Sequence, residues 1–215
     1  MQQGASGDRS ESEKISMAAD WHGKKLDKLA EDIKRCTVCQ NTLPLGARPV
    51  IAVGRHSKIL IIGQAPGLAV HQTGIPWNDK SGNNLRQWLN VDKVTFYNTS
   101  NISIIPMGFC YPGKGKSGDQ PPRSECAPLW HAQLLHHLPE LQLTLLIGKY
   151  AQQYYLPDNP FTGLTETVQN AYRFLPRFFP LPHPSPRNNI WMARNPWFKN
   201  DILPLLRYQV KRVLN

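Results

Sequence analysis

Four cysteines form a candidate set of metal ligands in this chain of 215 residues. Cys36 and Cys39 are two residues apart in a Cys-x-x-Cys pair, whereas Cys110 and Cys126 lie far downstream. The close pair places two thiolates on one tight turn, where both can face the same metal. In a chain that lacks a secretion signal, this usage is more typical of a metal site than of disulfides. The spacing alone leaves three interpretations open, namely a zinc site, an iron–sulfur cluster and four unligated thiols.

Two short loops carry further residues that could take part in binding or catalysis. The first, Gly-Gln-Ala-Pro-Gly at residues 63–67, has two glycines and a proline that favour a tight turn with exposed backbone N–H groups. The second, His-Pro-Ser-Pro-Arg-Asn at residues 183–188, combines a histidine and a cation with a proline-stiffened backbone. Stiff loops can enter nucleic acid without losing much conformational entropy. An ordinary strand-to-helix turn and a structural histidine are the alternative interpretations of the two loops.

The elements expected around these loops are strands that alternate with helices. Apolar and β-branched runs predict strands at 58–63, 94–105, 143–148 and 177–182. Helical periodicity predicts helices at 22–35, 80–90, 124–138 and 148–156, and a last helix with Asn195 as N-cap and Pro196 in its first turn. This alternation predicts an α/β fold with a four-stranded, mostly parallel sheet. Both loops then follow the carboxyl ends of strands, where such sheets bind ligands.

The fourth expected strand carries a regular proline pattern. Prolines occupy every second position from 180 to 186. In extended chain these prolines remove N–H donors from one side only, which predicts an edge strand with that side facing outward. We also expect Pro204 to kink the last helix.

Composition and charge narrow the class of protein. Lys and Arg number 25 against 15 Asp and Glu, for a net charge of +10, and six tryptophans are present. The first 20 residues are polar and carry more acids than bases, so the positive excess lies in residues 21–215. We expect a flexible tail at 1–20, one domain at 21–215, and a polyanionic partner, DNA first. No run approaches the ~18 apolar residues of a membrane span, and no signal peptide is seen, so a cytoplasmic monomer without membrane contact is expected.

Together these motifs resemble the uracil-DNA glycosylase superfamily. The first loop followed by Pro76 and Trp77 resembles the first motif of its iron–sulfur branch, and the four cysteines match the spacing of that branch. The second loop resembles the second motif, and its amino-acid sequence is closest to that of the single-strand-selective branch. The resemblance covers about residues 22–214 and implies a three-layer α/β/α fold. It also implies a 4Fe–4S cluster on Cys36, Cys39, Cys110 and Cys126, with zinc as the alternative.

The resemblance further implies roles for individual residues. Such enzymes extrude a base from DNA into a pocket. Trp77 takes the place of the aromatic residue that stacks on this base, with a core tryptophan as the alternative. His183 matches the histidine that hydrogen-bonds O2 of the leaving uracil. The other implied roles are base contact for Gly63 and Ala65, edge recognition for Asn101 with Asn98 as rival, and DNA contact for Ser185, Pro186 and Arg187.

The first loop departs from the family pattern. Related enzymes place an acid or an asparagine there to position or activate water, but this chain has Gln64 and Ala65. Gln64 can orient water without accepting its proton, so His71 is the expected base. The choice of Asn101 also requires an insertion near Met107 relative to the iron–sulfur branch.

The expected activity is hydrolysis of the N-glycosidic bond of a deaminated base in DNA, uracil first. The alternatives are excision of hypoxanthine or an alkylated base, and a lesion-binding protein that has lost catalysis. A cluster-bearing scaffold without DNA contact is disfavoured by the charge.

Overall fold

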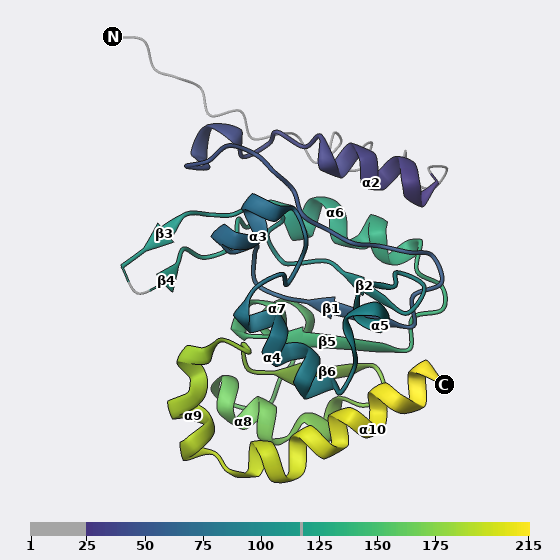
Figure 1. The fold of residues 1–215 in the computed structure, drawn as a ribbon, viewed down its shortest axis with the longest axis vertical. Coiled ribbons are helices and arrows are strands. Elements are labelled where there is room, and N and C mark those ends of the chain that lie inside the picture. Colours follow the sequence, from purple (N-terminus) through teal and green to yellow (C-terminus); the bar gives the residue numbers. More distant parts are fainter. Residues whose placement is uncertain (1–24, 117) are drawn as a thin grey trace.

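The computed structural model describes residues 25–116 and 118–215, and its centre is one parallel sheet (Figure 1). Four strands, β1 (Ile59–Ile62), β2 (Ile102–Ile104), β5 (Leu143–Ile147) and β6 (Phe178–Leu181), pair in the order β2-β1-β5-β6. All three pairings are parallel, which confirms the predicted sheet. The expected tail at 1–20 lies outside the described residues.

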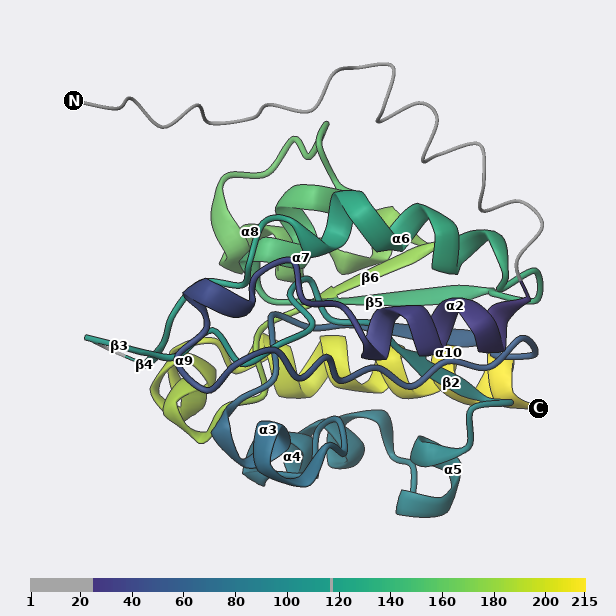
Figure 2. The same cartoon turned by 90° about the horizontal axis from the view of Figure 1, so that it is seen from above.

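Helices cover both faces of the sheet because its strands are apolar on both sides. Ile59 and Ile61 face one hydrophobic cluster, to which α4 (Lys80–Leu89) and α10 (Leu203–Leu214) contribute. Leu60 and Ile62 face a second cluster, to which α2 (Leu26–Lys34), α6 (Cys126–His136) and α7 (Lys149–Tyr155) contribute. Figure 2 shows α6 and α10 on opposite sides of the sheet, so the fold has the expected three layers.

Six shorter α-helices and strands accompany these elements, besides 3-10 turns at Gln40–Thr42, Ala171–Phe174 and Pro186–Asn188 and a π-helical turn at Phe198–Ile202. A two-stranded antiparallel hairpin projects from the body of the molecule near α3 (Figure 1). Within the described residues, no helix is both long and apolar enough to cross a membrane. The remaining elements are α3 (Leu68–Thr73), α5 (Lys93–Tyr97), β3 (Lys114–Gly115), β4 (Gly118–Asp119), α8 (Gly163–Gln169) and α9 (Asn189–Arg194).

Two expected elements differ from the structure. The strand predicted at 94–105 is helical in its first half, because the Asp92 carboxylate accepts a hydrogen bond from the Thr95 N–H at 2.7 Å and starts α5. Asn195 does not cap the last helix, since its side-chain amide donates to the Trp191 carbonyl at 2.8 Å. A π-helical turn at Phe198–Ile202 precedes α10, so Pro204 lies in the first turn of α10, where its missing N–H costs little.

The proline-containing strand β6 is an edge strand, as predicted. The Thr144 and Gly148 N–H groups donate to the Arg177 and Leu181 carbonyls, each at 2.9 Å, so the odd-numbered residues of β6 face β5. Pro180 therefore turns its nitrogen outward and removes no hydrogen bond from the ladder. At the opposite edge, Ala52 forms an isolated antiparallel bridge with Ile104 of β2.

A buried histidine joins α6, α7 and the chain that leaves β2. The ring nitrogens of His131 lie 3.1 Å from the Pro106 carbonyl oxygen (Nε2) and 2.6 Å from the Tyr155 hydroxyl (Nδ1). A carbonyl can only accept, so Nε2 carries the hydrogen and Nδ1 accepts from Tyr155. Burial lowers the pKa of His131 to about 4, so the ring is neutral when the protein is folded.

This histidine makes stability depend on pH. An unfolded chain protonates His131 near pH 6.5, whereas the folded protein resists protonation until about pH 4, so its stabilising contribution is lost as pH falls through this window. We expect His131 to lower the free energy of unfolding by about 3 kcal/mol in total as pH falls from 6.5 to 4. Urea unfolding of wild type and His131→Phe between pH 4 and 7 measures it. The variant should show the shallower slope, and equal slopes would contradict the assignment.

Candidate functional site

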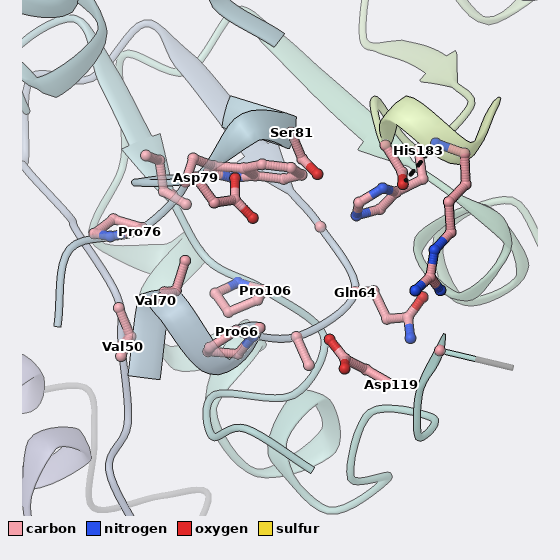
Figure 3. Close-up of a pocket in the computed structure, with 18 residues that line it drawn as sticks. Val50, Gln64, Pro66, Val70, Pro76, Asp79, Ser81, Pro106, Asp119 and His183 are labelled. Atoms are coloured by element: carbon pink, nitrogen blue, oxygen red, sulfur yellow. Dashed lines mark hydrogen bonds between the residues drawn. The ribbon is translucent and has the colours of Figure 1, made fainter. Parts of the chain in front are cut away.

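A cavity of about 440 Å³ opens beyond the carboxyl ends of the parallel strands (Figure 3). Its walls come from the first loop at 63–67, the segment 76–81, the end of β2 at 104–106, the hairpin at 118–119 and the second loop. Seven of the residues predicted for substrate or DNA contact line it, namely Gly63, Gln64, Ala65, Trp77, His183, Ser185 and Arg187. Segments far apart in the sequence thus meet where the expected sheet required them to meet.

Trp77 forms a fixed wall of this cavity. Its backbone adopts a left-handed conformation with φ of 56°, and Arg86 donates to its carbonyl oxygen at 3.3 Å. A Cβ on Gly63 would stand 2.8 Å from the indole ring, and one on Gly82 would stand 1.7 Å from the Trp77 carbonyl oxygen. These two glycines therefore allow the ring to lie against the first loop and the start of α4. Trp77 also packs against the core, so it serves the core and the cavity together.

His183 lies beside Trp77, with ring centroids 5.6 Å apart and planes inclined by 34°. Burial lowers the pKa of His183, an effect that the nearby Asp79 charge opposes. A neutral imidazole can donate one hydrogen bond to an acceptor in the cavity. Its backbone is held by the Asn188 side-chain amide, which donates to the His183 carbonyl at 2.7 Å.

The rest of the second loop is held by short hydrogen bonds. The Asn84 amide donates to the Pro184 carbonyl at 2.9 Å, and the Ser185 hydroxyl accepts from the Arg187 N–H at 3.3 Å. The Arg187 guanidinium lies close to the hairpin. Its Nη1 atom is 3.0 Å from the position that a Cβ on Gly118 would occupy. Pro186 begins a 3-10 turn and does not line the cavity.

The structure corrects the choice of Asn101 as base reader. Asn101 precedes the first residue of β2, and its carbonyl accepts from the Lys58 and Ile59 N–H groups, at the end of the sheet away from the cavity. Asn98 lies outside the cavity as well. The error follows from the misplaced strand, because α5 occupies the residues expected to begin it. Past the carboxyl end of β2 the cavity wall is Pro106, which has no N–H to offer a base.

His71 is likewise not where the sequence placed it. It lies in α3 with its ring 6.0 Å from that of Tyr111, and it does not line the cavity. Burial, and then the Arg48 charge, lower its pKa. Two carboxylates that the motifs did not indicate, Asp79 and Asp119, line the cavity instead. The glycines at 113, 115 and 118 indicate a turn in this segment, but no local pattern shows that the turn brings Asp119 to the cavity.

A model of the uracil DNA glycosylase superfamily matches residues 51–207, which span the sheet and both loops. The chain belongs to the uracil-DNA glycosylase superfamily. The match begins after Cys36 and Cys39 and therefore says nothing about that pair. Superfamily membership supports a glycosylase of base-excision repair that acts on DNA, and the matched residues include Trp77 and His183.

The four cysteines line a second, smaller cavity, and they are free thiols. Three of them accept hydrogen bonds of the kind that stabilise thiolates, from the Arg48 N–H to Cys110, from the Phe109 N–H to Cys126 at 3.5 Å, and from the Arg123 side chain to Cys39. Across the described residues, no three or more Cys, His, Asp or Glu side chains are arranged to hold a metal ion. Four thiols around one cavity are a ligand set that both a zinc ion and a four-iron cluster use.

The contact between Gly63 and Trp77 can be tested by adding one methyl group. Gly63→Ala should displace the indole and destabilise the protein by about 1–3 kcal/mol, as overpacking does. Gly67→Ala is the matched control, because its Cβ would meet only the Asp119 carboxylate at 3.5 Å, an ordinary contact. Urea unfolding and tryptophan fluorescence measure both effects. Equal stability of the two variants would show that Trp77 is not held against the loop.

Proposed function

We propose that this protein is a DNA glycosylase that hydrolyses the N-glycosidic bond of a deaminated base, uracil first. One observation carries the proposal. The rings of Trp77 and His183, which are far apart in the sequence, line one cavity with their centroids 5.6 Å apart, in a chain that belongs to the superfamily. An aromatic wall and a hydrogen-bond donor in one cavity are what recognition of a flipped base requires.

The cavity supports the following course of reaction. The extruded base stacks on Trp77, whose rigid backbone keeps the ring in place. Cleavage leaves the electron pair of the bond on the departing base, so negative charge develops on its carbonyl oxygens. Neutral His183 donates a hydrogen bond to O2 of the base and stabilises that charge, which is typically worth about 10²–10³ in rate. A neutral imidazole suits this task because no positive charge has to be buried in the cavity.

The charge of the chain supports DNA as the partner. The net charge is +10, and Arg187 lies at the cavity beside the proline-stiffened loop. We propose that Ser185, Pro186 and Arg187 contact the strand from which the base is extruded, with Arg187 filling the gap.

We further propose that Cys36, Cys39, Cys110 and Cys126 hold a 4Fe–4S cluster. Their shared cavity and the hydrogen bonds to three of the sulfurs support this assignment. A bound cluster would supply a covalent crosslink between chain segments remote in sequence. The thiols of Cys110 and Cys126 have pKa values raised by burial, to about 11 and about 12, so without a metal they stay protonated at neutral pH.

The cluster assignment predicts a coloured protein. Anaerobic purification should give brown protein with broad absorption near ~400 nm and about four iron atoms per chain. Cys110→Ser should bleach this absorption and lower solubility. One stoichiometric zinc in a colourless protein would overturn the iron assignment, and four freely alkylated thiols without metal would overturn any metal site.

The glycosylase assignment predicts a defect in the chemical step when His183 is removed. His183→Ala should lower single-turnover excision of uracil by about 10²-fold or more and leave DNA binding nearly unchanged. Alkali cleavage of the abasic sites in single- and double-stranded oligonucleotides measures the rate, and a salt titration measures binding. Wild type that excises no deaminated base from either substrate would refute the enzyme and favour a lesion-binding protein.

A further inference from the structure

The first loop lacks a group that can accept the proton of an attacking water. Gln64 and Ala65 line the cavity where related enzymes can place an acid, and neither is a base. His71, the base expected from the sequence, lies outside the cavity. Apart from His183, the proton acceptors among the described lining residues are two carboxylates, Asp79 and Asp119. Figure 3 shows both pointing into the cavity, from opposite walls.

Asp79 already has a structural task. Its carboxylate accepts a hydrogen bond from the Gly82 N–H at 2.8 Å and caps the N-terminus of α4. This cap also fixes the short segment that carries Trp77. An oxygen engaged in this way is less available to a water molecule.

Asp119 is placed differently. It lies on β4, in register with Lys114 of β3, so the projecting hairpin brings it to the cavity. Its Oδ2 atom would stand 3.5 Å from a Cβ on Gly67, which places the carboxylate directly against the first loop. The Gln64 side-chain amide donates to the Gln120 carbonyl at 3.4 Å and links the loop to the hairpin. No group within the described part of the chain donates a hydrogen bond to the Asp119 carboxylate.

A carboxylate in this cavity could either activate a water molecule or recognise the base. The position of Asp119 distinguishes between these two roles. Asp119 is exposed and lies on the projecting hairpin (Figure 1), whereas the side chains of Trp77 and His183 are partly buried. A flipped base enters deeply, and its sugar stays at the entrance. A carboxylate at the entrance would lie nearer the sugar end of the glycosidic bond than the far edge of the base.

We propose that Asp119 is the catalytic base, which accepts a proton from a water molecule that Gln64 orients toward C1′ of the sugar. This inference rests on the proposed glycosylase activity. The water oxygen forms the new bond to C1′ while one of its protons passes to the Asp119 carboxylate. The C1′–N bond breaks, and its electron pair leaves with the base, which later regains a proton. The products are an abasic sugar with a hydroxyl at C1′ and the free base.

The surrounding charges are consistent with this role. Although Asp119 is exposed, the cavity wall partly desolvates its carboxylate and so raises its pKa; the Asp79 charge adds to the rise, whereas the Arg187 and Lys114 charges oppose it. A carboxylate with a raised pKa is a stronger base than an ordinary one. Arg187 comes from the second loop, so contact of that loop with DNA changes the field at Asp119.

The test is single-turnover excision by Asp119→Asn, which keeps the shape of the side chain and removes its basicity. We expect the rate to fall by about 10²–10⁴-fold, equally for every base that wild type excises, with DNA binding unchanged or tighter. Sodium formate added to Asp119→Ala should restore part of the rate, because a free carboxylate can replace the missing one. Lys116→Gln is the matched control, since it alters one exposed charge of the same hairpin and leaves the cavity intact.

Each outcome separates this inference from the proposed function. Wild type without excision refutes the glycosylase, and Asp119 then has no reaction to serve. Excision by Asp119→Asn at the wild-type rate refutes Asp119 as base and leaves the glycosylase standing. A loss that differs strongly between bases also overturns the proposal, because it identifies Asp119 as a group that recognises the base. Circular dichroism of each variant verifies that the fold is retained.

Discussion

The backbone of residues 105–110 is the constraint on which both cavities depend. The Ile105 N–H donates to the Ile61 carbonyl, and the Met107 and Gly108 N–H groups donate to the carbonyls of Gly63 and Gln64, at 2.9–3.0 Å. The first loop is therefore held by the segment that leads directly to Cys110. The next residue of that segment, Phe109, donates to the Cys126 sulfur and accepts from the Val50 N–H at 2.8 Å. The cysteine cavity and the candidate active site therefore share one short stretch of hydrogen-bonded backbone.

The cavity combines a rigid interior with a wall carried on a projecting element. Trp77 is locked by two glycines, by Arg86 and by the capped start of α4, so little entropy is lost when a flat base stacks on it. The opposite wall includes a hairpin of two short strands, held by its register and by the Gln64 amide. A stacking surface fixed in this way is consistent with the proposed capture of a flipped base.

The sequence was informative wherever local pattern and tertiary position agree. The apolar runs gave all four strands, and the alternating prolines placed β6 at an edge, because only an outward nitrogen tolerates proline there. The two loops were found because parallel strands end at one edge of the sheet. Asn101 was misplaced because the Asp92 cap overrode a β-branched run, so the strand began later than its composition indicated. Asp119 was missed because a hairpin's reach into a cavity depends on packing that no local pattern contains.

Both edges of the sheet are closed to further strands. On β6, Pro180 presents no N–H to an incoming chain, and on β2 the bridge to Ala52 occupies part of the ladder. Sheet proteins commonly aggregate when an exposed edge recruits the edge of another molecule. Here the missing N–H of Pro180 on β6 and the bridge to Ala52 on β2 both hinder the addition of another strand. The consequence is a central sheet that offers little template for fibrils at either edge.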